Sequence, residues 1–273
     1  MKILYLGDIV GKTGREAVCR LLPALRRDLG TDFVIINGEN AAHGFGITIK
    51  ICEALFAAGA DVVVTGNHAW DQREIIDFID TEPRLLRPLN LPPNTPGRGF
   101  GVFAAGNGRR VAVIQAQGRL FMPPLDDPFR MIDTLLDDCR LGDGIDAIFV
   151  DMHAEATSEK MALGQFLDGR VSAVVGSHTH IPTADAQILP RGSAYQTDIG
   201  MCGDYDSVIG MEKQTAIERL TQTLPTERLE PASGEATVCG LLVKTDDATG
   251  LAVSVSPLRL GGRLLQAYPA LAS

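Results

Sequence analysis

Short apolar runs rich in valine, isoleucine and leucine recur along the chain and alternate with stretches of helical period. The runs predict strands at 3–6, 33–36, 62–64, 147–151 and 172–175. The periodic stretches predict helices at 14–29, 48–58, 129–138 and 157–168. In the first helix, Val18, Leu22 and Leu25 fall on one face. Wholly apolar strands that alternate with amphipathic helices indicate parallel sheets covered on both faces.

Two further pairs of apolar runs are separated by turn residues and predict antiparallel hairpins. Asn107-Gly108, a strong hairpin signal, lies between runs at 100–105 and 110–116. The same pattern recurs in the tail, with runs at 236–245 and 250–256. Because no repeat or linker interrupts the alternation, we expect a single domain with two packed sheets.

Polar residues gather directly after the predicted strands, and the five histidines of the chain fall in or close to these stretches. The stretches are 6–8, 37–40, 66–68, 151–153 and 176–180. In sheets with parallel strands, ligands bind beyond the carboxyl ends of the strands. The pattern predicts that imidazoles, carboxylates and amides converge on one metal-binding edge.

The chain is acidic, since 25 lysine and arginine residues stand against 34 aspartate and glutamate residues, for a net charge of −9. This balance argues against a broad basic surface for long nucleic acid or for an anionic membrane. An acidic protein can still bind phosphate locally where divalent cations reverse the field of the site.

The five cysteines are widely spaced and contain no Cys-x-x-Cys pair, so the sequence predicts neither a disulfide framework nor a thiolate zinc site. The chain enters its first strand directly, without the pattern of a secretory signal. Its apolar runs stay well short of the roughly 20 residues that a membrane-spanning helix needs. We therefore expect a cytoplasmic protein without a membrane anchor.

The segment from Gly7 to Thr13 resembles a phosphate-binding P-loop but has the wrong spacing. Three residues lie between its first glycine and its Gly-Lys pair, whereas a P-loop has four at that place. Asp8 would also aim a carboxylate at the phosphates. Asp8 therefore makes better sense as a metal ligand, with helix capping as the alternative.

The remaining motifs differ in strength when each is considered alone. His178 and His180 form the strongest signal, because two imidazoles two residues apart at a strand end can face one centre. Asn67-His68 fits a pair of site residues and, about equally well, a helix cap followed by an exposed histidine. A lone histidine such as His153 is more often structural. The segment from Thr157 to Lys160 is typical of a helix start rather than of catalysis.

Together, the strand ends offer oxygen and nitrogen ligands without a thiolate. The candidate ligands are Asp8, Glu39, Asn40, Asn67, His153, His178 and His180. Structural zinc normally takes four ligands rich in thiolate, and seven ligands are too many for one ion. The set suits two ions such as manganese, iron or zinc, roughly 3.5–4 Å apart and bridged by a carboxylate.

The order of these motifs resembles the calcineurin-like metallophosphoesterases and, more narrowly, their bacterial YmdB-type branch. The matching segments are 7–11, 37–46, 65–70, 87–90, 151–160, 176–182 and 195–198, and they extend over nearly the whole chain. In the wider superfamily the first motif is Asp-x-His, whereas Val10 stands at that histidine position here. Glu39 replaces the bridging aspartate, as in the YmdB-type branch, and the resemblance implies that Asn40 substitutes for the missing imidazole.

The resemblance implies an α/β fold, a four-layer αββα sandwich of two mixed sheets flanked by helices, in one domain over 1–273. It also implies two ligand sets. Asp8, Glu39, Asn40 and His180 would hold one ion, and Glu39, Asn67, His153 and His178 the other. His68 would lie just outside the ions as the catalytic imidazole. His43 is a candidate substrate contact or a support for the ligands, with a simply exposed loop residue as the alternative.

The activity implied by the resemblance is hydrolysis of a phosphodiester, with 2′,3′-cyclic nucleotides as the favoured substrates. A hydroxide bridging the two ions would attack phosphorus in line, and His68 would assist the leaving oxygen. The alternatives are a phosphomonoesterase or nuclease with the same ions, and a metal-stabilised regulatory scaffold with incidental hydrolysis. RNA and a second copy of the chain stay open as partners.

Overall fold

The computed structural model describes residues 1–223 and 227–270. Its strands are β1 Lys2–Leu6, β2 Phe33–Asn37, β3 Val62–Val64, β4 Leu85–Leu86, β5 Phe100–Ala104, β6 Arg110–Gln117, β7 Ala147–His153, β8 Ala173–Ser177, β9 Gln187–Ile188, β10 Ala194–Gln196, β11 Gly203–Asp204, β12 Ala236–Thr245 and β13 Ala252–Leu260. Its α-helices are α1 Gly11–Leu29, α2 Ile49–Ala58, α3 Ile75–Phe78, α4 Pro128–Asp138, α5 Thr157–Leu167 and α6 Lys213–Thr221, and a 3-10 helix, η1, spans Gly66–His68.

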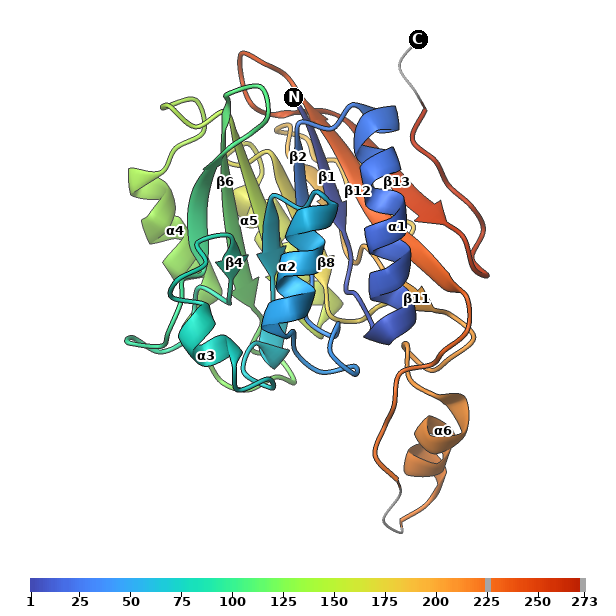
Figure 1. The fold of residues 1–273 in the computed structure, drawn as a ribbon. Coiled ribbons are helices and arrows are strands. Elements are labelled where there is room, and N and C mark those ends of the chain that lie inside the picture. The colour runs from blue at the N-terminus through green and yellow to red at the C-terminus, as the bar shows by residue number, and fades with distance from the viewer. Residues whose placement is uncertain (224–226, 271–273) are drawn as a thin grey trace.

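Two mixed sheets face each other, with helices on both outer sides (Figure 1). In the described residues the first sheet has the order β11-β12-β1-β2-β3-β4, with β13 also paired to β12. The second has the order β5-β6-β7-β8-β10-β9. Strands β1 to β4 are parallel to their neighbours in that series, and so are β6, β7, β8 and β10. The carboxyl ends of these strands form the edge at which the candidate ligands lie.

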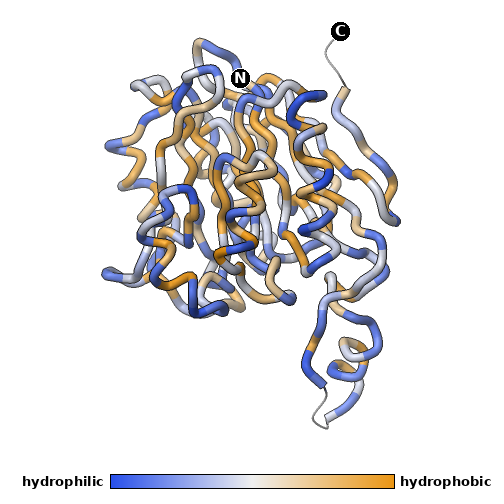
Figure 2. Tube along the Cα trace, in the orientation of Figure 1, coloured by the Kyte–Doolittle hydropathy of each residue, from blue (hydrophilic) through white to orange (hydrophobic). Residues whose placement is uncertain are grey.

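Alternation along β1 shows how the layers pack. Leu4 and Leu6 belong to the core beneath α1 and α2, whereas Ile3 and Tyr5 belong to the core between the two sheets. Tyr5 stacks on Phe149 of the second sheet, with ring centroids 5.6 Å apart. A third core lies between the second sheet and helices α4 and α5. The predicted four layers of helix, sheet, sheet and helix are confirmed, and apolar residues follow the strands in Figure 2.

The predicted strands, helices and hairpins are all present, with shifted ends. Helix α1 begins at Gly11 rather than at residue 14. Its first turn has no apolar face, so the apolar pattern could not predict that turn. Strand β7 continues to His153 and β8 to Ser177, beyond the apolar runs that predicted them. Both extensions carry polar side chains between the sheets, so polarity hid them from the sequence pattern. The extension of the domain over 1–273 stays a prediction.

One segment, 205–223 with 227–235, leaves the two sheets and carries α6 (Figure 1). The sequence pattern did not predict this helix, whose buried side chain is Ala216. Within the described parts of the chain, every helix is too short or too polar to cross a membrane.

Candidate metal centre

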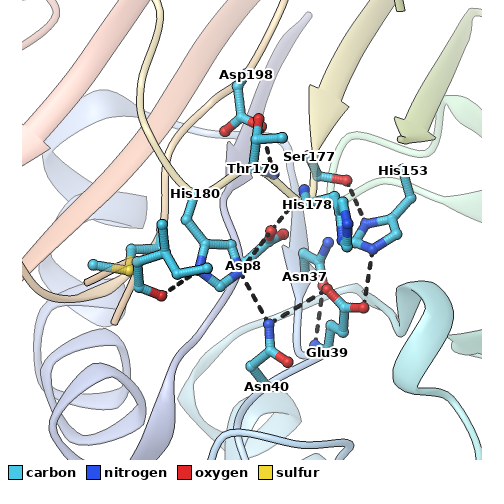
Figure 3. Close-up of polar contacts among 12 residues, drawn as sticks. Asp8, Asn37, Glu39, Asn40, His153, Ser177, His178, Thr179, His180 and Asp198 are labelled. Atoms are coloured by element: carbon cyan, nitrogen blue, oxygen red, sulfur yellow. Dashed lines mark hydrogen bonds and ion pairs between the residues drawn. The ribbon is translucent and has the colours of Figure 1, made fainter. Parts of the chain in front are cut away.

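The candidate ligands meet at one edge shared by both sheets (Figure 3). The first sheet contributes Asp8, Glu39, Asn40 and Asn67, from the loops after β1, β2 and β3. The second contributes His153 at the end of β7, and His178 and His180 in the turn after β8. Packing of one sheet on the other is therefore what assembles the site.

Glu39 belongs to two groups of side chains that are each compact enough to hold an ion. Ligand atoms of Glu39, His153 and His178 lie within 4.8 Å of one another, and we call this group the His153 cluster. Ligand atoms of Asp8, Glu39 and His180 meet the same limit and form the His180 cluster. A carboxylate common to both groups has the position of a bridge between two ions.

The charge states of these buried groups favour a cation. Burial raises the pKa of Asp8 and of Glu39, and the Glu39 charge raises that of Asp8 further. Burial also lowers the pKa of His153 and of His178 to about 3, so both imidazoles are neutral near pH 7. Neutral imidazoles ligate metals, and a bound cation stabilises carboxylates that are crowded in this way.

Asp8 has one satisfied and one unsatisfied oxygen. Its Oδ2 accepts a hydrogen bond from the main-chain N–H of His178 at 2.8 Å. Its Oδ1 is buried and has no hydrogen-bond partner among the described residues. A cation at the His180 cluster would remove this cost. The alternative of Asp8 as a helix cap is wrong, because the N-cap of α1 is Val10.

A serine and a carboxylate orient His153 from behind. Ser177 Oγ donates its one proton to Asp151 Oδ1 at 2.6 Å. His153 Nδ1 lies 2.8 Å from the same Oγ and must therefore be the protonated nitrogen. The lone pair on His153 Nε2 then faces Glu39 Oε1 and Asn67 Oδ1, each at 2.9 Å. Three electron-rich atoms that meet in this way favour a cation between them.

A main-chain carbonyl orients His180. Its Nδ1 lies 2.7 Å from the oxygen of Ile209, which can only accept, so Nδ1 carries the proton. Its Nε2 faces Asp8 Oδ2 at 3.5 Å and Asn40 Nδ2 at 3.1 Å. The Asn40 amide also lies 3.4 Å from Glu39 Oε2 (Figure 3). A flip of this amide would present its oxygen, a metal ligand, in place of its nitrogen.

The turn that carries His178 and His180 is strained. Both residues have left-handed backbones, with φ of 92° and 67°, which side chains other than glycine seldom adopt. The ring of His178 packs edge-on against that of His153 at a centroid distance of 4.8 Å, and its Nε2 lies 3.4 Å from Glu155 Oε2. This conformation delivers one imidazole to each cluster.

Gln115 of β6 ties the Asn67 turn to the second sheet. Its Oε1 accepts from the N–H groups of Gly66 and of the residue before it, at 3.1 and 3.2 Å. Its Nε2 donates to Asp151 at 2.8 Å.

Gly66 has a φ of 58°, and a Cβ there would lie 2.7 Å from Glu39 Cδ. Glycine is thus required where the turn passes the shared carboxylate.

His68 lies next to the two clusters but outside them. Its main-chain N–H donates to Glu39 Oε1 at 3.3 Å. Its Nδ1 lies 2.8 Å from Asp71 Oδ2, and its ring packs edge-on against Phe45. The imidazole is 28% exposed. Because Asp71 engages Nδ1, Nε2 is the nitrogen left for a substrate.

His43 is not brought into either cluster, although it shares a loop with Glu39 and Asn40. It is exposed and lines a cavity of about 570 Å³ together with Lys12 and Arg228. The residues that line this cavity include none of the candidate ligands and not His68, so the role of His43 stays a prediction.

The sequence analysis missed the residues behind the ligands. Asp151 shares a face with His153, because side chains two apart in a strand point the same way. A carboxylate within an otherwise apolar strand was the feature of the sequence that could have indicated its role. Thr157 begins α5, and Glu159 and Lys160 lie in its first turn, so the helix-start interpretation is confirmed; it did not indicate the contacts that these two side chains make. Both are buried; Glu159 accepts main-chain N–H groups and Lys160 pairs with Asp198 at 2.9 Å.

A family model described as YmdB-like protein matches residues 4–258 of this chain. The chain belongs to the YmdB-like family. The match spans every candidate ligand, together with His68 and His43. It confirms the resemblance that the motifs indicated.

Relatives of the YmdB-like chain match over nearly their whole length. A Bacillus subtilis protein described as 2′,3′-cyclic-nucleotide 2′-phosphodiesterase is 50% identical over 93% of this chain and 95% of its own. The crystal structure of a hypothetical protein from Thermus thermophilus has a TM-score of 0.89 at 44% identity, covering 96% of this chain and 100% of that one. The structure of a Mycoplasma pneumoniae phosphatase has a TM-score of 0.88 at 33% identity, covering 98% and 95%.

Proposed function

We propose that this YmdB-like protein is a phosphodiesterase that hydrolyses 2′,3′-cyclic nucleotides at a site for two metal ions. The observation that carries the proposal is Glu39, whose carboxylate belongs to both the His153 cluster and the His180 cluster. The substrate class is supported by the Bacillus subtilis relative, which is described as acting on 2′,3′-cyclic nucleotides.

The two ligand sets follow the two clusters. Asp8, Glu39, Asn40 and His180 would hold one ion, and Glu39, Asn67, His153 and His178 the other. Oxygen and imidazole donors of this kind suit manganese or iron, and also zinc. When bound, the two ions supply charge neutralisation at the phosphoryl group and lower the pKa of water so that it attacks near neutral pH.

His68 would act as the general acid. Asp71 accepts from Nδ1, so the imidazolium form of His68 would give its Nε2 proton to the ribose oxygen as the bond of that oxygen to phosphorus breaks. The proton cancels the negative charge that develops on the leaving oxygen. No side-chain nucleophile is needed in this scheme.

We further propose that His43 contacts the substrate. The cavity that it lines also contains Lys12 and Arg228, whose positive charges would meet a phosphate group, together with the acidic Glu16 and Glu230. A His43→Ala variant is expected to raise KM while its metal content stays that of the wild type. Loss of a bound ion in this variant would instead make His43 a support of the ligands.

A phosphomonoesterase is the second candidate. It is favoured by the Mycoplasma pneumoniae structure, which is described as a phosphatase and is 33% identical to this chain. Long RNA is a poorer candidate, because a net charge of −9 opposes binding of an extended polyanion.

An assay of Mn²⁺-reconstituted protein separates these activities. The substrates are 2′,3′-cyclic nucleotides, 3′,5′-cyclic nucleotides, a phosphomonoester and short RNA, and we expect fastest turnover of the first. His68→Ala and Asn67→Ala are the site variants, and EDTA removes the ions. Full activity of both variants, together with indifference to EDTA, would contradict the proposed site. Faster turnover of the phosphomonoester would favour the second candidate.

A further inference from the structure

The strained turn after β8 needs something to hold it. His178 and His180 are both left-handed, and Thr179 lies between them. Strained conformations persist only where the surroundings over-determine them. The contacts of Thr179 therefore decide whether two imidazoles keep their positions.

Thr179 makes three hydrogen bonds to one buried carboxylate and one buried ammonium group. Asp198 Oδ2 accepts from the main-chain N–H of Thr179 at 3.1 Å and from its hydroxyl at 2.6 Å (Figure 3). Lys160 Nζ donates to the Thr179 hydroxyl at 3.0 Å and to Asp198 Oδ2 at 2.9 Å. The three groups form a closed triangle of hydrogen bonds.

The fold makes room for this triangle at some cost. Lys160 and Asp198 are each 1% exposed, and burying two charges is unfavourable unless their geometry is good. Lys160 reaches the turn from α5 by passing Gly176, where a Cβ would lie 2.7 Å from its Cδ. The other oxygen of Asp198 accepts the N–H of Gly200 at 2.8 Å. The pair therefore anchors the turn to α5 and to the segment after β10.

We propose that Lys160 and Asp198 are positioning residues that act through Thr179 on both metal clusters at once. His178 belongs to the His153 cluster and His180 to the His180 cluster, so one triangle controls a ligand of each ion. This inference rests on the proposed function for the presence of two ions. It differs from a purely stabilising role, in which the ion pair would hold β8 and β10 together without affecting the ligands.

Thr179 offers the cleanest test, because it carries no charge. Thr179→Val removes the hydroxyl at nearly constant shape, and Thr179→Ser keeps it. The readouts are Mn²⁺ affinity and stoichiometry, from competition with a chromogenic chelator, and the melting temperature of the metal-free protein. We expect Thr179→Val to weaken both sites by about ten- to hundredfold, the range for a lost support behind metal ligands, and Thr179→Ser to stay close to the wild type.

Charge variants extend the test. Lys160→Met and Asp198→Asn each leave one buried partner behind, whereas the double variant removes both charges and protects the fold. We expect the double variant to melt near the wild type but still to bind both Mn²⁺ ions more weakly. Ser158→Ala, an exposed position on α5, is the control that should match the wild type in every readout.

The outcomes separate this inference from the proposed function. Two Mn²⁺ ions bound at wild-type affinity by Thr179→Val and by the double variant, whatever their melting temperatures, would overturn the positioning role alone. Failure of the wild type to bind Mn²⁺ would overturn the two-ion site, and the positioning role with it. Weakening of a single ion by Thr179→Val would also contradict a device that serves both clusters.

Discussion

The His153 cluster and the His180 cluster share Glu39 but are supported in different ways. Behind His153 stands a relay of side chains, Ser177 and Asp151, buried between the two sheets. Behind His180 stands the main-chain carbonyl of Ile209, in the segment that leads away from the sheets to α6. A carboxylate that acts through a hydrogen bond makes an imidazole a stronger ligand. The support that most strengthens an imidazole as a ligand therefore lies at the His153 cluster.

The clusters also differ in charge. The His180 cluster contains two carboxylates, Asp8 and Glu39, and one imidazole, whereas the His153 cluster contains one carboxylate and two imidazoles. Harder, more highly charged ions prefer carboxylate oxygen, and imidazole suits borderline ions. The comparison teaches that two ions bridged by one carboxylate need not be equivalent. We expect the more positive ion at the His180 cluster.

The largest effect is expected from a change at Glu39, the residue that both clusters share. Glu39→Gln should release both ions and lower kcat roughly a thousandfold, because about 4 kcal/mol of transition-state stabilisation would be lost. Metal content per chain and steady-state kinetics measure this. Glu53→Gln, at an exposed carboxylate on α2, is the matched control. Retention of one ion at wild-type affinity by Glu39→Gln would make the clusters independent.

His68→Ala should slow the chemical step without changing either cluster. We expect kcat to fall roughly a hundredfold, within the range for a lost general acid, while two ions stay bound. Asp71→Asn, which weakens the hold on Nδ1, should cost less. Rate and metal content are measured on the same samples. A His68→Ala protein that loses an ion would place His68 among the ligands rather than beside them.

Ser177→Ala sharpens the comparison, because it removes the support of one cluster only. The affinity of a single Mn²⁺ ion should fall by about tenfold, and the second ion should be unaffected. Ser172→Ala is the matched control, since this serine is equally buried but bonds to Gly250 away from the site. An equal loss at both ions would show that support from Asp151 is not confined to the His153 cluster.

The smallest effect is a gradual dependence of metal affinity on pH. The raised pKa of Asp8 and of Glu39 means that these carboxyls keep their protons to higher pH than usual, so protons compete with the ions. Affinity should therefore fall as pH falls, first at the His180 cluster, which contains both groups. His153 and His178, with pKa values lowered to about 3, compete little above pH 4. Mn²⁺ titrations between about pH 5 and pH 8 check this, and a flat profile would contradict it.

The limits of local pattern are clearest at β7 and α5. The apolar run 147–151 predicted a strand, but β7 continues for two more residues, to His153. His153 faces the other sheet, as Asp151 does, and the apolar pattern does not show this. Thr157 was correctly placed at a helix start, yet the burial of Lys160 depends on Gly176 and Asp198, which are distant in sequence. Periodicity reports which face of an element is apolar. It carries no information on which polar side chain from another element will meet it.

The sequence by itself determined the alternation of strands and helices, the family, and the strand ends at which polar residues gather. These properties are local, because each strand is recognised from its own apolar residues and each motif from its own spacing. Only the tertiary structure decided that Glu39 is shared by two clusters, that Asp151 and Ile209 orient different imidazoles, and that Lys160 and Asp198 hold Thr179. These relations join residues of the two sheets and their loops, so they come into existence only when the layers pack.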